Sequence, residues 1–98
     1  MNEAQYKTKL SNKIRALLPG CIVLRNDANL IPGIPDILVL YNDTWGMLEA
    51  KTSYDAPMQP NQEHYIDVLN DMSFASFICP ENEEVVLYDL QQSLGAVR

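Results

Sequence analysis

Two short apolar segments, residues 37–41 and 45–52, constrain the fold of this chain most strongly, because only a short polar turn separates them. Their length and their β-branched and aromatic content are typical of buried strands. The intervening Asn42-Asp43-Thr44 is rich in turn-forming residues. The pattern therefore predicts a β-hairpin, with Asp36 directly before its first strand and Glu49 inside its second.

The acidic and basic residues of this hairpin are placed to meet. Side chains alternate along a strand, so Glu49 and Lys51 point to one face and Ala50 to the other. A tight turn brings Asp36 beside Glu49. A carboxylate in an otherwise apolar strand is costly unless it is paired or bound to a metal. Two converging carboxylates suit Mg²⁺ or Mn²⁺, and a nearby ammonium can orient an attacking water or stabilise developing charge.

The rest of the pattern predicts a single α/β domain spanning residues 1–98. Apolar residues at three- and four-residue spacing indicate a helix over 3–18, with Asn2 as its N-cap and Pro19-Gly20 as its end. A short apolar strand over 21–24 and a polar loop over 25–29 come next.

The second half continues in the same manner. We expect a helix over 61–71 capped by Asn61, a strand over 74–79, and a helix from Pro80-Glu81 to about Leu94, ended by Gly95. Residues 85–88 fit a strand as well as a helix. The order α-β-β-β-α-β-α predicts a central mixed sheet flanked by helices.

The motif set resembles the PD-(D/E)xK nuclease superfamily, and within it the small VRR-NUC type nucleases often carried by phages. Gly33-Ile34-Pro35-Asp36 matches the Gly-x-Pro-Asp of that group, Glu49-Ala50-Lys51 matches the Glu-x-Lys, and Gln62 matches a glutamine common in the following helix. The resemblance runs from about residue 3 to residue 94 and rests on the order of the elements as much as on the short signature. It implies a restriction-endonuclease-like core.

The resemblance also implies a function and a division of roles. The function is Mg²⁺- or Mn²⁺-dependent endonucleolytic cleavage of DNA, on branched substrates such as Holliday junctions, by a homodimer. Asp36, Glu49, the backbone carbonyl of Ala50 and an additional acid from the first helix, Glu3, would be metal ligands. Lys51 would position the attacking water and Gln62 would orient water or phosphate. Asp36, Glu49, Lys51 and Gln62 are thus the candidate catalytic residues.

The net charge of −6 opposes nucleic-acid binding, which draws much of its affinity from phosphate neutralisation. The basic residues nevertheless concentrate in the first half of the chain, and only Arg98 follows Lys51. The candidates for DNA contact are Arg25 and Asn26 with Asn29 in the loop before the motif, and Lys7 and Lys13 with Lys9 and Arg15 on the first helix. A plain polar loop and a solvated helix face are the alternative interpretations.

Other classes of protein fit less well. No apolar run reaches the length of a membrane span, and the polar N-terminus lacks a signal-peptide core, so we expect a cytoplasmic protein. Cys21 and Cys79 fit no metal motif and are expected to be reduced, buried thiols. His64, Trp45 and Tyr41 are interpreted as structural. Two alternatives stay open: a catalytically weak nucleic-acid- or protein-binding module with a nuclease fold, and a structural accessory protein with an accidental motif.

Overall fold

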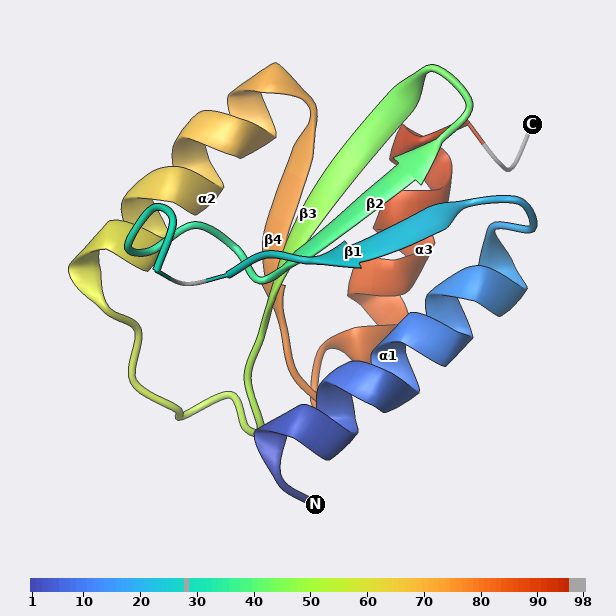
Figure 1. The fold of residues 1–98 in the computed structure, drawn as a ribbon. Helices are drawn as coiled ribbons and strands as arrows, with labels where there is room; N and C mark the ends of the chain where they lie inside the picture. The colour runs from blue at the N-terminus through green and yellow to red at the C-terminus, as the bar shows by residue number, and fades with distance from the viewer. Residues whose placement is uncertain (28, 96–98) are drawn as a thin grey trace.

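The computed structural model describes residues 1–27 and 29–95, so Ala28 and the basic residue Arg98 lie outside the described part of the chain (Figure 1). Its elements follow the predicted order. They are α1 (Glu3–Leu17), β1 (Ile22–Arg25), β2 (Ile37–Tyr41), β3 (Thr44–Ala50), α2 (Pro60–Met72), β4 (Phe74–Ile78) and α3 (Glu83–Ser93).

One four-stranded mixed sheet organises the molecule, as predicted. The strands lie in the order β1-β2-β3-β4. β1, β2 and β3 pair antiparallel, and β4 joins β3 in parallel through the α2 crossover. The predicted hairpin is therefore β2–β3, with Ile37 opposite Leu48 and Tyr41 opposite Thr44.

The core lies between one face of the sheet and helices α1 and α3. Inward residues of the strands, including Ile37, Val39 and Leu48, join Tyr6 of α1 and Leu90 of α3 in a single apolar cluster. α2 packs on the opposite face, over β4 and β3 (Figure 1). The sheet is thus covered on one face by two helices and on the other by one.

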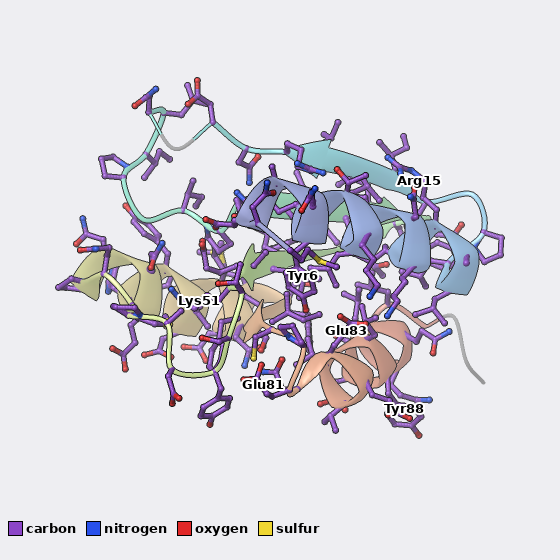
Figure 2. All side chains as sticks on the ribbon, turned by 90° about the horizontal axis from the view of Figure 1, so that it is seen from below. Tyr6, Arg15, Lys51, Glu81, Glu83 and Tyr88 are labelled. Carbon is purple, nitrogen blue, oxygen red and sulfur yellow. The ribbon has the colours of Figure 1, made fainter. Side chains whose placement is uncertain are left out.

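A polar tie reinforces the contact between α1 and α3. The Tyr6 hydroxyl donates a hydrogen bond to Glu83 Oε1 at 3.0 Å, and the two residues face each other in Figure 2. Burial and this hydrogen bond raise the pKa of the Tyr6 phenol, which keeps it a neutral donor. At the start of α1, Asn2 and Gln5 form a capping box, which confirms Asn2 as the N-cap.

Several predicted boundaries are wrong by a few residues. Gln59, not Asn61, is the N-cap of α2, because Pro60 already occupies the first helical position. α3 begins at Glu83 after a turn at residues 80–82, and not at Pro80. Residues 85–88 are helical, since Val86, Leu87 and Leu90 all reach the core at helical spacing.

The two cysteines flank strands and do not lie within them. Cys21 precedes β1 and is partly buried, and Cys79 follows β4 and is buried. Both are free thiols. Within residues 1–27 and 29–95, no helix combines the length and the apolar character that crossing a membrane requires.

Candidate active site

The hairpin brings Asp36 next to Glu49, as its turn predicts. Continuing the β2–β3 register by one residue places Asp36 opposite Glu49. The carboxylate of Asp36 is fixed there, because Oδ1 accepts a hydrogen bond of 3.1 Å from the backbone N–H of Ala50. The other carboxylate oxygen, Oδ2, is in contact with the Lys7 ammonium.

A third carboxylate comes from the first turn of α1. One carboxylate oxygen each of Glu3, Asp36 and Glu49 lies within 4.8 Å of the other two. The three residues differ in environment, since Glu3 is exposed, Asp36 is partly buried and Glu49 is only 5% exposed. The structure therefore assembles the three predicted acidic ligands, which come from α1, the start of β2 and the end of β3.

Lys7 enters this acidic cluster, a role that the sequence interpretation did not assign to it. Its Nζ lies 2.8 Å from Asp36 Oδ2 and 3.6 Å from Glu3 Oε1. Partial burial opposes the charge of the ammonium, but the hydrogen bond to Asp36 and the charges of Asp36 and Glu3 outweigh it, and the pKa of Lys7 is raised. Lys7 was predicted to contact DNA, but the structure has it fixing the Asp36 carboxylate.

Glu49 is the most strongly perturbed acid of the cluster. Burial raises its pKa to about 7, and the negative charge of Asp36 adds to the shift, while Lys51 and Lys7 oppose it. One hydrogen bond supports the carboxylate, from Gln62 Nε2 to Glu49 Oε2 at 3.3 Å. The protein thus holds a buried carboxylate whose negative charge its own residues compensate only in part.

Lys51 and Gln62 complete the arrangement from the strand end and the start of α2. Lys51 is 8% exposed, and its Nζ donates to the carbonyl of Pro57 at 2.8 Å and to Gln62 Oε1 at 3.4 Å. Gln62 Oε1 also accepts from the backbone N–H of Gln59 at 3.0 Å. Gln62 therefore connects Lys51 to Glu49, and α2 sets its position.

A cleft of about 220 Å³ opens at this point. Its lining is mainly polar and combines Glu3, Glu49, Lys51 and Gln62 with Ala50 and the loop residues Thr52, Ala56, Pro57 and Gln59. Asp36 and Lys7 are not among the lining residues. Within the described ranges Lys51 forms no ion pair. The cleft thus joins a cluster of acids to an ammonium that has no carboxylate partner among those residues.

Close packing explains why the Gly-x-Pro-Asp motif has a glycine at position 33. Gly33 has φ +92°, and a Cβ added there would lie 2.4 Å from Asn61 Cβ in the first turn of α2. The loop that leads to Asp36 therefore touches the helix that carries Gln62. A side chain at position 33 would push these two parts of the site apart.

Gly33→Ala is accordingly expected to lower the free energy of unfolding by about 2–4 kcal/mol, from left-handed strain plus overpacking. Gly20→Ala is the matched control, because Gly20 has φ +90° and nothing within 4 Å of an added Cβ. Urea unfolding of both variants would separate the cost of left-handed backbone strain from the cost of overpacking. Equal losses in the two variants would contradict the packing role of Gly33.

The predicted DNA-contact residues do not gather at the cleft. Arg25 Nη2 donates to Thr8 Oγ1 at 3.3 Å, and Asn26 Nδ2 donates to the Pro35 carbonyl at 2.8 Å. Because the Asn26 N–H also donates to the carbonyl of Asp36 at 2.8 Å, Asn26 holds the backbone of the motif. In the same loop, the Asn29 N–H donates to Asp27 Oδ1 at 2.9 Å.

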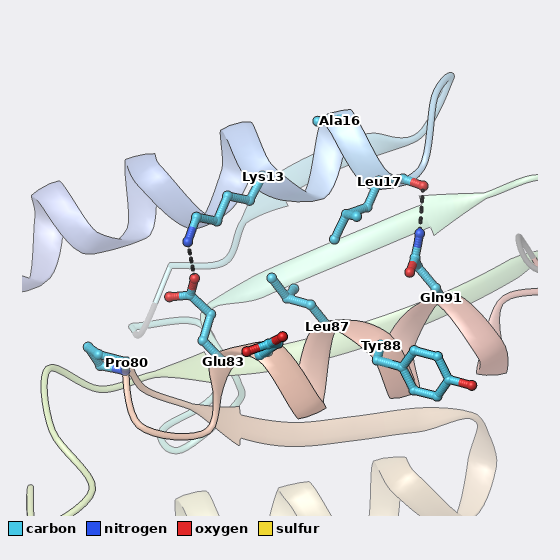
Figure 3. Close-up of a pocket in the computed structure, with 9 residues that line it drawn as sticks. Lys13, Ala16, Leu17, Pro80, Glu83, Leu87, Tyr88 and Gln91 are labelled. Atoms are coloured by element: carbon cyan, nitrogen blue, oxygen red, sulfur yellow. Dashed lines mark hydrogen bonds and ion pairs between the residues drawn. The ribbon is translucent and has the colours of Figure 1, made fainter.

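None of the remaining helix cations lines the cleft. Lys13 pairs with Glu83 across the groove between α1 and α3 (Figure 3). Arg15, near the C-terminal end of α1, and Lys51 lie toward opposite sides of the molecule in Figure 2. Lys9 is exposed on α1. His64 is exposed and its ring packs edge-on against Tyr65.

Lys7, Gln59 and the Pro57 carbonyl are the parts of the site that the sequence interpretation missed. The only available signal was for Lys7, which follows Glu3 by four residues and so shares its helix face. Comparison of the chain with protein-family models, with curated proteins and with solved structures gives no match. The geometry of the cleft itself is therefore the ground for proposing a function.

Proposed function

We propose that this protein is a Mg²⁺- or Mn²⁺-dependent endonuclease that hydrolyses DNA phosphodiester bonds, with branched DNA as its substrate. The observation that carries the proposal is the convergence of Glu3, Asp36 and Glu49 beside a cleft that Glu3, Glu49, Lys51 and Gln62 line. The resemblance of Gly33–Asp36 and Glu49–Lys51 to the VRR-NUC signature gives the substrate class and the homodimer.

The donor set fits a hard divalent cation. All its side-chain donors are carboxylate oxygens, which Mg²⁺ and Mn²⁺ prefer. Three carboxylates meet one ammonium, that of Lys7, so the ionised cluster keeps an excess of negative charge. Burial, together with the negative charge of Asp36, raises the pKa of Glu49 to about 7. Glu3, Asp36 and Glu49 would hold the ion, with the Ala50 carbonyl as a further ligand.

The residues of the chain have separate parts in this proposal. A divalent ion held by these carboxylates would neutralise phosphate charge and lower the pKa of a water molecule. Lys51 presents its ammonium to the cleft, where it holds the attacking water or a phosphate oxygen through charge-assisted hydrogen bonds. Gln62 holds the carboxylate of Glu49, and Lys7 holds that of Asp36. Each functional group is thus fixed before the substrate arrives.

A second candidate function is supported by charge. The chain has a net charge of −6, and Lys13 pairs with an acid outside the cleft. Phosphate backbones favour basic surfaces, so these facts support a protein-binding or catalytically weak module with the same fold. Metal-dependent catalysis distinguishes the two functions.

Cleavage of a labelled four-way DNA junction, with linear duplex and single strands as controls, tests the proposal. At low salt with Mg²⁺ or Mn²⁺ we expect the junction to be cut, and chelator to abolish cutting. Glu49→Gln should cut at least about 100-fold more slowly, because it removes an ionised group at the reacting centre. A folded wild-type protein that cuts no substrate with metal present would favour the binding module.

A further inference from the structure

A second cavity lies beside the cleft of the candidate active site. It encloses about 350 Å³, within the range of small-molecule sites in proteins. We call it the α2 pocket, because three of its lining residues belong to α2. Four apolar or aromatic side chains and two acids form most of its lining: Tyr54, Met58, Ile66, Phe77, Glu63 and Asp67. The pocket thus combines aromatic rings with carboxylates.

The α2 pocket and the cleft share Lys51 and Ala56, which line both cavities. The sheet also places the two cavities side by side. Glu49 of β3, in the cleft, is the register partner of Phe77 of β4, in the pocket, and register partners point to the same face of a sheet. One ligand with two parts can therefore occupy both cavities. A nucleotide of a DNA strand has two such parts, a phosphate and a base.

Tyr54, in the loop that joins β3 to α2, is held in place and yet exposed. Its backbone N–H donates to Glu81 Oε2 at 3.0 Å, and its ring packs edge-on against Phe77, with the ring centroids 5.8 Å apart. The residue nevertheless remains 61% exposed. A ring that is fixed before a ligand arrives loses little conformational freedom on binding. Tyr54 therefore resembles the aromatic platforms on which proteins stack the bases of single strands.

The charged groups of the α2 pocket limit what it can bind. Glu63 and Asp67 are four residues apart and so share one face of α2. Within residues 1–27 and 29–95 neither acid forms an ion pair, and carboxylates repel anions and accept hydrogen bonds. A cation entering the pocket meets the buried ammonium of Lys51. An uncharged ring with N–H donors on its edge satisfies both conditions.

We propose that the α2 pocket binds a single nucleobase of the DNA strand whose phosphate lies in the cleft. The ring of Tyr54 stacks on the base, and the carboxylates of Glu63 and Asp67 accept hydrogen bonds from its exocyclic amino group. Cytosine and adenine carry such a group and thymine does not, and a carboxylate is a favoured partner of the cytosine amino group. The inference rests on the proposed function for the polymer, DNA.

Only an unstacked base can enter this pocket. Bases inside a duplex are covered on both faces, and a protein that contacts the face of one must take it out of the stack. This costs least where the base is already unpaired. We therefore expect the α2 pocket to favour branched or single-stranded DNA over uninterrupted duplex.

Stacking also suits the charge of this chain. The net charge of −6 limits the affinity that phosphate neutralisation can supply. Stacking of a base on an aromatic ring needs no positive charge. A base pocket beside the cleft thus adds affinity that an acidic chain does not obtain from phosphate contacts alone.

Amide chemical shifts of the metal-free protein, titrated with uncharged nucleosides, test this inference. We expect deoxycytidine to shift the amide signals of Tyr54, Met58 and Phe77 in a saturable way, and thymidine to bind roughly 5-fold or more weakly. Tyr54→Ala should weaken deoxycytidine binding by roughly 5-fold or more, and Tyr54→Phe should retain it. Tyr88→Ala is the matched control, because Tyr88 is 58% exposed and lines the separate groove between α1 and α3.

The two acids are tested by the choice between nucleosides. Glu63→Leu combined with Asp67→Leu should remove the preference for deoxycytidine over thymidine, because no carboxylate then accepts from the amino group. A preference that persists in this double variant would contradict the part given to the acids.

Four results would overturn the inference as a whole. They are no saturable shift with any nucleoside, shifts centred on the groove between α1 and α3, binding that is unchanged in Tyr54→Ala, and methylguanidinium binding more tightly than deoxycytidine. The last result would assign the pocket to an arginine side chain of a protein partner.

No step of this titration uses metal or catalysis, so its outcome is separate from that of the nuclease assay. A protein that binds deoxycytidine in the α2 pocket but cuts no DNA would keep the pocket and lose the nuclease. A protein that cuts DNA while the pocket amides do not shift would keep the nuclease and lose the pocket.

Discussion

Glu49→Gln is expected to stabilise the metal-free protein at pH 8 by about 1–3 kcal/mol. The upper limit follows from the difference between the folded-state and unfolded-state pKa of Glu49, at about 1.4 kcal/mol per pKa unit. The folded-state pKa of Glu49, about 7, lies above the ordinary glutamate value of 4.5. Folding therefore favours the protonated acid, and its stabilising contribution is complete below the unfolded-state pKa. This contribution is lost as pH rises through about 7, because the buried carboxyl must then ionise.

Glu49→Gln removes this loss of stability at high pH while keeping the shape of the side chain. The glutamine Oε1 can still accept the hydrogen bond that Gln62 Nε2 now gives to Glu49. The stability difference between Glu49→Gln and wild type should therefore be near zero at pH 4 and greatest at pH 8, as measured by urea unfolding in chelator. Glu84→Gln, at an exposed acid of α3, should show no comparable gain.

Divalent metal should reverse the order of stability. An ion that binds only the folded state adds about 2.7 kcal/mol at a hundred times its dissociation constant, and Glu49→Gln forfeits that gain. A variant that is more stable without metal and less responsive to it would identify Glu49 as a residue kept for function at the expense of stability. A stability loss at pH 8 in chelator would instead indicate a purely structural carboxylate.

Lys51→Met is expected to lower the rate of DNA cleavage by about 10²–10³-fold, the effect typical of removing one group that stabilises developing charge. Metal affinity should change little, because Lys51 donates to Pro57 and Gln62 and pairs with no acid of the cluster. Single-turnover cleavage together with calorimetric Mn²⁺ titration would separate these two effects. Lys9→Met, at an exposed position of α1, should leave both quantities unchanged.

Other combinations of change in metal affinity and cleavage rate would give Lys51 a different role. If Lys51→Met reduces metal affinity and cleavage in parallel, its ammonium acts by positioning Glu49 through Gln62, and not at the reacting atoms. If neither quantity changes in a folded variant, Lys51 has no part in catalysis. The hydrogen bond to the Pro57 carbonyl would then be its structural role.

Local patterns were sufficient to predict the hairpin and therefore half of the site. The turn at residues 42–43 fixes the register, and the register places Asp36 beside Glu49. The helix bearing Gln62 was also predictable from its spacing, although its cap was misplaced because Pro60 starts the helix one residue earlier. In each case the deciding interactions lie close together along the chain.

Contacts distant in sequence were not predictable in this way. Lys7 pairs with Asp36 and Lys13 with Glu83 because α1 packs against the sheet and against α3. Residue type alone suggested that both lysines face DNA. The apolar run of β2 likewise predicted a buried strand, whereas Leu38 and Leu40 are only partly covered in the described chain. What covers a face depends on tertiary and quaternary packing, which periodicity does not encode.

Paramagnetic broadening of backbone amide signals by Mn²⁺ would test the metal site most directly. At low Mn²⁺ we expect the amide signals of Glu3, Ala50 and Lys51 to broaden first, and Glu49→Gln to abolish this effect. The acids at the start of α3, Glu83 and Glu84, provide an internal comparison. Broadening centred on α3, or a pattern around Ala50 that persists unchanged in Glu49→Gln, would contradict a metal site at Glu3, Asp36 and Glu49.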